Sequence, residues 1–191
     1  TFKKVYYDEN LGRAVSKFVP AENLIVPYST SDLETCPNIT HVVKMSLNDL
    51  RKRQLSGFYR DIPVIPAQGD SNAAREELER IDGMYPSNVD YDCTLLECHV
   101  DLDLEGFEEM GDDGEPTGIK VPYIVTISQD NGQILSIRRN YDEDDEDKKK
   151  IQYFVHYKFL PGFGFYGLGL IHTIGGLSRT ATAALRQLID A

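Results

Sequence analysis

Apolar and polar residues alternate strictly between residues 95 and 106. The apolar positions are Leu96, Cys98, Val100, Leu102 and Leu104, and the polar positions between them are Glu97, His99, Asp101 and Asp103. Successive side chains of a strand point to opposite faces, so the pattern predicts a half-buried antiparallel strand. On this interpretation His99 lies on the polar, solvent-facing side.

Three further apolar runs continue the same sheet. Residues 121–140 hold two of them on either side of Asn131-Gly132, a pair typical of a type I′ hairpin turn. Residues 151–160 predict a fourth strand, with Tyr153, Val155, Tyr157 and Phe159 on one face. Together these strands predict a four-strand antiparallel meander.

Helical spacing is found before and after the predicted meander. Residues 46–57 predict a short helix capped by Ser46, with Asp49 in its first turn and Gly57 at its end. Residues 71–83 predict a second short helix. Residues 23–30 and 39–45 are short strands, the first placed at a sheet edge by Pro27. The predicted fold class is therefore α+β, with one long helix at the C-terminal end.

The C-terminal helix has its apolar residues at alternating steps of four and three. They are Leu170, Ile174, Leu177, Ala181, Ala184, Leu188 and Ala191. Such a seam packs against another helix or against a sheet, and its small residues allow a close approach. The pattern leaves open whether this surface is the chain's own sheet or a neighbouring subunit.

Composition and net charge limit the kinds of partner and the cellular compartment that fit this chain. The chain has 191 residues and a formal charge of −11, which disfavours a surface that grips nucleic acid or anionic lipid. DNA that slides past without binding is still compatible with this charge. Three cysteines (Cys36, Cys93 and Cys98) do not make a disulfide framework and fit a reducing cytoplasm. No segment resembles a signal peptide or a membrane span, and both ends give the impression of an excerpt from a longer protein.

The glycines at 162, 164 and 167 match the dinucleotide-binding pattern G-x-G-x-x-G. That motif needs a buried parallel strand before the turn and a returning strand after the helix. Here Pro161 intervenes, and Phe163, Phe165 and Tyr166 crowd the space that phosphate oxygens need. We therefore interpret the segment as an aromatic turn, and keep a nucleotide-binding enzyme domain as the alternative.

Acidic residues supply the candidate metal ligands. Asp101, Asp103, Glu105 and Asp112 match the spacing of a calcium loop, although no helix leads into it. The other interpretation is the solvated face of an amphipathic strand, and residues 142–150 form a solvated charged loop. No catalytic grouping of Ser, Cys, His and acid is found, so we expect a protein that is not an enzyme and needs no cofactor.

Five stretches together resemble the portal proteins of short-tailed double-stranded DNA bacteriophages or related prophages. They are ITHVVKMSLNDLRKRQLSGFYRDI, LLECHVDLDLEGFE, GIKVPYIVTI, QYFVHYKFLPGFGFYGLGLIH and ATAALRQLIDA. They run in order from about residue 40 to residue 191. The resemblance implies three parts: an extended N-terminal segment (1–40), an α+β wing-like domain (41–160), and a glycine-aromatic turn with the start of a long helix leading to a stem beyond the chain (161–191).

The resemblance also implies a function. Portals are rings, typically of twelve subunits, that pass double-stranded DNA in packaging and ejection. They meet terminase, scaffolding, coat and tail-adaptor proteins, and they belong to the virion after assembly in the host cytoplasm, with no membrane role. We expect interface rather than catalytic residues, namely Arg51, Lys52, Arg53, Leu177, Arg179, Ala181, Ala184 and Arg186.

Overall fold

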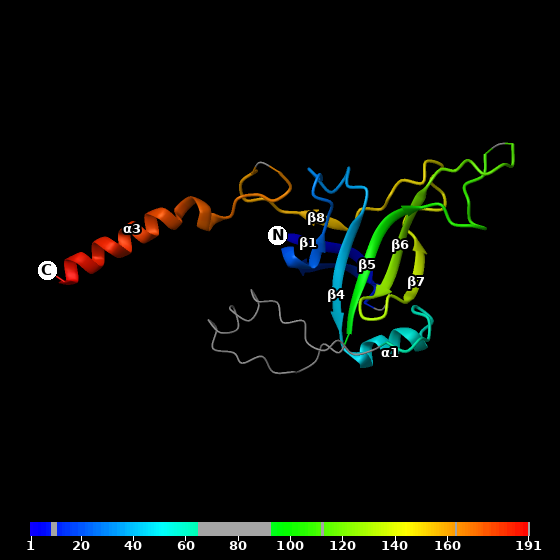
Figure 1. Ribbon diagram of the computed structural model, residues 1–191, viewed down its shortest axis with the longest axis horizontal. Helices are drawn as coiled ribbons and strands as arrows, with labels where there is room; N and C mark the ends of the chain where they lie inside the picture. The colour runs from blue at the N-terminus through cyan, green and yellow to red at the C-terminus, as the bar shows by residue number, and fades with distance from the viewer. Residues whose placement is uncertain (9–10, 65–92, 112, 163, 191) are drawn as a thin grey trace. The chain divides into compact units, whose positions relative to one another are not determined.

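The computed structural model describes residues 1–8, 11–64, 93–111, 113–162 and 164–190, and divides into two compact units (Figure 1). Unit 1 comprises Thr1–Ala21, Pro27–Cys36 and Gln152–Ala191, and unit 2 comprises Glu22–Val26 and Pro37–Ile151. Each unit is built around its own antiparallel sheet. The predicted helix at 71–83 lies outside the described residues.

Unit 2 holds a five-stranded sheet in the order β3-β4-β5-β6-β7. The strands are β3 (Leu24–Ile25), β4 (Ile39–Met45), β5 (Cys93–Leu102), β6 (Val121–Ser128) and β7 (Ile134–Arg139), and the 3-10 turn η1 (Ala21–Asn23) precedes β3. Consecutive strands pair antiparallel throughout. The predicted α+β class and the strands at 39–45 and 121–140 are confirmed, and the strand predicted at 95–106 spans Cys93–Leu102.

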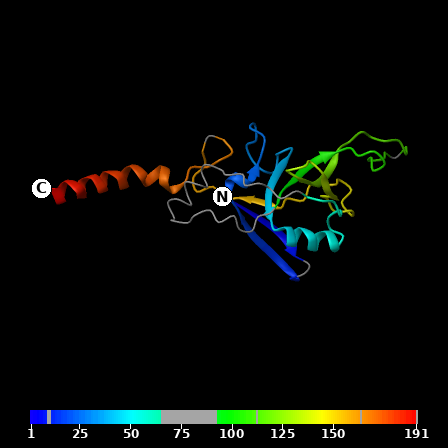
Figure 2. The same cartoon turned by 60° about the horizontal axis from the view of Figure 1, so that its bottom comes forward.

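The predicted four-strand meander is wrong in its last member. Strand β8 (Phe154–His156) leaves the larger sheet and pairs with β1 (Phe2–Asp8), which also pairs with β2 (Arg13–Val19). Figure 2 shows β1 and β2 side by side as a hairpin. Phe154 is 2% exposed whereas Val155 is 41% exposed, so the face that includes Tyr153 and Val155 is not the buried one. Periodicity predicted a strand over 151–160, of which only Phe154–His156 form one, and it does not identify the partner strand.

The first helix, α1 (Leu47–Leu55), forms as its sequence predicts. The Ser46 hydroxyl accepts a hydrogen bond from the Asp49 backbone N–H at 3.1 Å, which satisfies one of the free donors of the first turn. Leu50 anchors the helix in an apolar core with Tyr59 and with sheet residues such as Leu95 and Leu135. This core holds α1 against the end of the sheet where β4 ends and β5 begins (Figure 1).

The hairpin between β6 and β7 is confirmed, but its predicted type I′ turn is wrong. Ser128 and Gln133 close a four-residue loop, in which the Gly132 N–H donates to the Ser128 carbonyl at 2.9 Å. Only Gly132 has a positive φ, of 67°, whereas a type I′ turn requires one at Asn131 as well. The Asn131 amide instead donates to the Pro63 carbonyl at 3.1 Å, which fastens the loop to the segment that follows α1.

Candidate interaction surfaces

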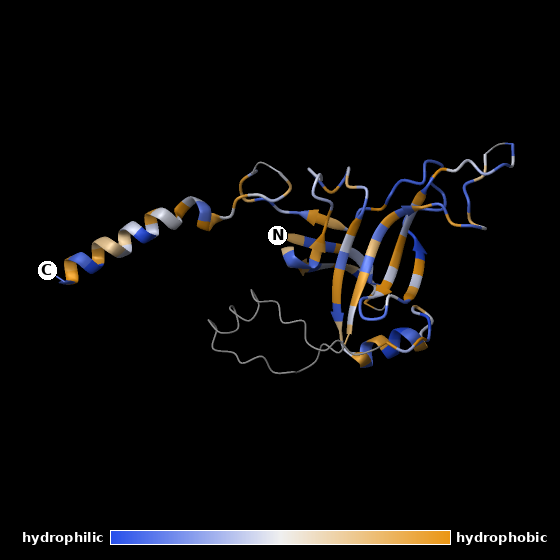
Figure 3. Ribbon diagram, viewed as in Figure 1, coloured by the Kyte–Doolittle hydropathy of each residue, from blue (hydrophilic) through white to orange (hydrophobic). Residues whose placement is uncertain are grey.

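The C-terminal helix α3 (Leu170–Asp190) has no buried residue among its 21. Leu177 is 73% exposed and Leu188 is 76% exposed, although both belong to the apolar seam. Figure 3 shows apolar and polar positions alternating around the helix. Within the described residues α3 therefore leaves its apolar face uncovered.

The predicted interface residues of α3 divide between two faces. At 3.6 residues per turn, two positions along a helix differ by about 200°. Arg179 follows Leu177 by two positions, and Arg186 precedes Leu188 by two. Both arginines therefore project away from the apolar seam, and neither pairs with a carboxylate among the described residues. Leu177, Ala181 and Ala184 remain together on the seam.

The basic cluster of α1 is satisfied within unit 2. Arg51 forms an ion pair with Asp61, and Lys52 lies 3.3 Å from the Asp49 carboxylate. Arg53 donates to the Tyr59 hydroxyl at 3.2 Å and lies over that ring. Exposed pairs of this kind contribute roughly 0–1 kcal/mol each. Arg51, Lys52 and Arg53 therefore have local partners, in contrast to the arginines of α3.

The glycine-rich segment forms a closed loop. At its neck, Leu160 and Leu168 exchange backbone hydrogen bonds of 3.2 and 2.9 Å. Phe165 packs inside unit 1, with its ring 5.7 Å from that of Phe2 and 4.8 Å from that of His156. Within unit 1 the loop thus connects β8 to the start of α3 and is fixed by an aromatic cluster.

Backbone crowding explains two of the three motif glycines. A Cβ atom at Gly162 would lie 2.9 Å from the Tyr166 carbonyl oxygen, and one at Gly167 would lie 2.6 Å from the Leu160 carbonyl oxygen. The chain's own carbonyls thus occupy the space that a phosphate-binding turn leaves open. The preceding strand β8 is antiparallel to β1, and α3 begins at Leu170, beyond the last glycine. This geometry does not support the nucleotide-binding alternative.

The candidate calcium ligands are not gathered into a site in the part of the chain that the structure describes. Asp101 lies near the end of β5, while Asp103 and Glu105 follow it as exposed residues. The Gly106 N–H is bound by the Glu108 carboxylate at 2.8 Å, and Asp112 lies outside the described residues. No group of three or more His, Cys, Asp or Glu side chains there is arranged to hold a metal.

The comparison with protein families identifies the family of the chain. The model of the family described as phage SU10 portal protein matches residues 3–191. The chain belongs to this portal protein family. No match was found among curated proteins. Portal proteins are structural components of the phage virion. Among the helices that the structure describes, none has the length and apolar content needed to cross a membrane.

One buried polar cluster of this portal-family chain was not predicted from the sequence. Glu97 is 8% exposed and His99 is 3% exposed, so the expectation that His99 faces solvent is wrong. These residues share a face of β5 with Cys93 and Leu95, which belong to the core under α1. The face that carries the acidic alternation is thus buried over most of β5 and becomes exposed only at Asp101.

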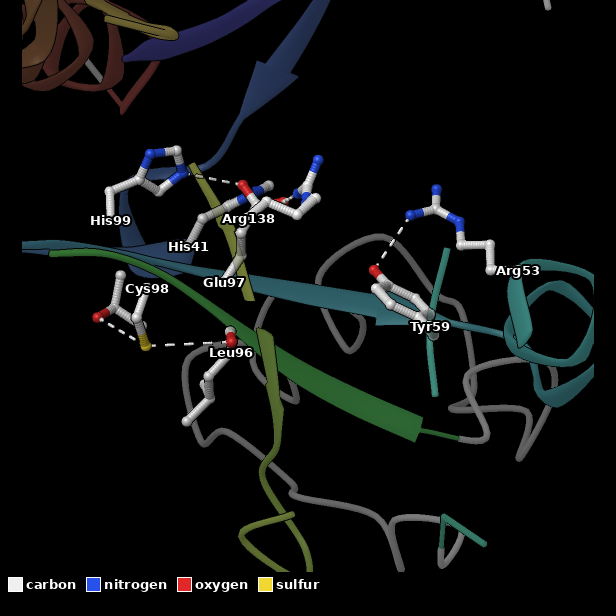
Figure 4. Close-up of polar contacts among 9 residues, drawn as sticks. His41, Arg53, Tyr59, Leu96, Glu97, Cys98, His99 and Arg138 are labelled. Carbon is white, nitrogen blue, oxygen red and sulfur yellow. Dashed lines mark hydrogen bonds and ion pairs between the residues drawn. The ribbon is translucent and has the colours of Figure 1, made fainter. Parts of the chain in front are cut away.

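The Glu97 carboxylate is the centre of this cluster (Figure 4). Its oxygens lie 3.0 Å from His99 Nε2, 3.9 Å from His41 Nδ1 and 3.9 Å from Arg138 Nη2. The Arg138 guanidinium also lies 4.5 Å from the centre of the Phe58 ring. Such a group satisfies a buried charge within the sheet.

The Glu97 cluster depends on strand pairing. Glu97 lies directly between His41 on β4 and Thr126 on β6, and Thr126 faces Ser136 on β7. Nearby, burial raises the pKa of Tyr59, and the adjacent Arg53 opposes this effect. Neighbouring strands supply these partners, so no local motif in the sequence marks them.

Proposed function

We propose that this chain forms part of a homo-oligomeric portal ring through which double-stranded DNA is packaged and ejected. The observation that carries the proposal is α3, an amphipathic helix of 21 residues with no buried side chain. Membership of the portal family supports an assembly of copies, in which the uncovered face of such a helix contacts a neighbour. The ring of twelve and the terminase, scaffolding, coat and tail-adaptor partners are part of this proposal.

The two faces of α3 have different roles in the proposed ring. The seam with Leu177, Ala181 and Ala184 packs closely against a neighbouring subunit, because alanines let two backbones approach. Full burial of a leucine such as Leu177 contributes about 1.5–3 kcal/mol. Arg179 and Arg186 face away from the seam, where they pair with carboxylates of another subunit. Arg51, Lys52 and Arg53 are secondary candidates because they already have local partners.

The acidic charge of the chain fits a channel that does not retain DNA. A formal charge of −11 repels the phosphate backbone, and the repulsion acts over about 8 Å at physiological salt. In the proposed ring, DNA therefore passes through the channel as a polyanion and is not tightly bound.

The oligomeric state of the full-length protein tests the proposal. We expect closed rings in negative-stain electron microscopy and a matching mass in mass photometry. Leu177→Asp places a charge in the seam and should reduce the ring fraction, whereas Leu55→Asp makes the same change at an exposed residue outside α3 and should not. A full-length protein that stays monomeric at micromolar concentration would refute the proposal.

A further inference from the structure

Charge is divided very unevenly between the two units. The segments of unit 1 contain seven Lys and Arg residues against five Asp and Glu, a net charge of +2. The remaining residues, in unit 2, contain 13 against 26, a net charge of −13, which together give the −11 of the whole chain. A basic and an acidic surface on one chain are complementary between two copies. Such heterologous contacts form rings where the rotation between copies closes.

The basic surface of unit 1 lies on the β1–β2 hairpin. Lys4 and Lys17 face each other across the two strands, and their ammonium groups lie 5.9 and 5.6 Å from the centre of the Tyr6 ring. Like charges placed opposite each other on a sheet are destabilising. Lys17 is exposed and has no carboxylate partner among the described residues.

The other face of the hairpin is apolar and exposed. Val5, Tyr7 and Phe18 lie on it, with 40%, 65% and 65% of their surface exposed. Strand β2 is also the edge of its three-stranded sheet. Exposed apolar side chains next to a free sheet edge are typical of a docking surface, while the opposite face, with its two lysines, favours an acidic partner.

Unit 2 contains a segment of suitable charge. Residues 142–147 read DEDDED, and Asp142, Asp144 and Glu146 are exposed without a cationic partner among the described residues. The segment is held at both ends: Glu143 forms an ion pair with Arg139, and Lys148 forms one with Glu109. It therefore presents a fixed row of carboxylates.

We infer that the β1–β2 hairpin of one subunit docks on residues 142–147 of the neighbouring subunit, around the Lys4–Lys17 pair. This contact would lie between neighbouring subunits of the proposed ring, so the inference rests on the proposed function. It predicts an assembly that weakens as salt rises, because charge pairs at an interface rim are screened.

A reciprocal charge exchange in the full-length protein tests the contact by mass photometry at fixed salt. Lys17→Glu places a carboxylate opposite Lys4, which relieves the repulsion within the hairpin and leaves its fold intact, while the docking charge is lost. We expect the concentration for half-assembly to rise about tenfold, as for a lost charge pair. Asp144→Lys with Glu146→Lys should have a similar effect, and the combined variant should recover assembly.

Lys120→Glu is the matched control, because it changes the net charge equally at an exposed residue outside both surfaces. The inference fails if Lys17→Glu assembles like wild type, if the control weakens assembly equally, or if the combined variant shows no recovery. Retained rings with weaker binding of duplex DNA would assign the hairpin to DNA instead. A wild-type protein without rings would refute the proposed function itself.

Discussion

Replacing Gly167 with alanine tests why the chain carries so much glycine before α3. The added Cβ would lie 2.6 Å from the Leu160 carbonyl oxygen and 3.0 Å from Lys158 Cβ. The first contact is closer than packed protein atoms tolerate, so the backbone around Leu160 must shift. That carbonyl accepts the 2.9 Å hydrogen bond from the Leu168 N–H, and the reverse bond measures 3.2 Å.

The expected loss of stability follows from the hydrogen bonds and ring contacts that this backbone shift disrupts. Each backbone hydrogen bond contributes about 1 kcal/mol, and the displaced loop also loosens Phe165 from Phe2 and His156. We therefore expect Gly167→Ala to lower the free energy of unfolding by about 1–3 kcal/mol. The amide protons of Leu160 and Leu168 should also exchange faster with solvent.

Urea unfolding and hydrogen exchange measure the two effects. Gly176→Ala is the matched control, since no atom lies within 4 Å of its Cβ and the residue is inside α3. The control should raise helix content, because alanine is favoured over glycine in a helix by about 0.5–1 kcal/mol. If Gly167→Ala stays within about 0.5 kcal/mol of wild type, crowding does not explain this glycine.

Three further substitutions test other elements by urea unfolding. Ser46→Ala removes the acceptor of the Asp49 N–H and should cost about 1 kcal/mol, which Ser46→Asp should largely restore. Glu97→Ala leaves His99 and Arg138 without their shared carboxylate and should lower the free energy of unfolding by about 2–4 kcal/mol. Thr126→Val is the control, because the Thr126 hydroxyl has no partner among the described residues, and it should cost little. Equal costs would contradict the role of Glu97 as the centre of the buried cluster. Burial lowers the pKa of His156 from 6.5 to about 4, with Lys158 and the N-terminal amine contributing. Unfolded chains therefore bind the proton first, so stability should fall as the pH drops from about 6.5 to 4, and His156→Phe should flatten that slope; an unchanged slope would contradict this account.

Local patterns predicted the elements well and their partners poorly. Ser46 and Asp49 define the start of α1 within four residues, so the sequence alone predicted the cap. The strand at Phe154 was also predicted, but its partner β1 lies about 150 residues earlier in the chain. Alternation states which residues share a face and leaves open which sheet the strand joins.

The buried cluster at Glu97 could not be predicted for a related reason. Alternating acids and apolar residues indicated one polar face for the whole of β5. In the structure that face carries Cys93 and Leu95 into the core beneath α1, and Glu97 is compensated by His41 and Arg138 from other strands. For the glycine loop, the sequence indicated crowding by its neighbouring aromatic side chains, whereas the atoms closest to Gly162 and Gly167 in the structure are backbone carbonyl oxygens.

The function of a subunit that works by contacting other subunits is indicated by the surfaces that its own fold leaves exposed. The seam of α3 was visible in the sequence, but only the structure shows that no side chain of the helix is buried. The net charge of −11 likewise does not reveal that unit 1 has a net charge of +2 and unit 2 one of −13, because the segments of each unit are interleaved along the chain. In the proposed ring both surfaces meet another copy of the chain, and charge exchange at Lys17 tests this contact independently of the helix.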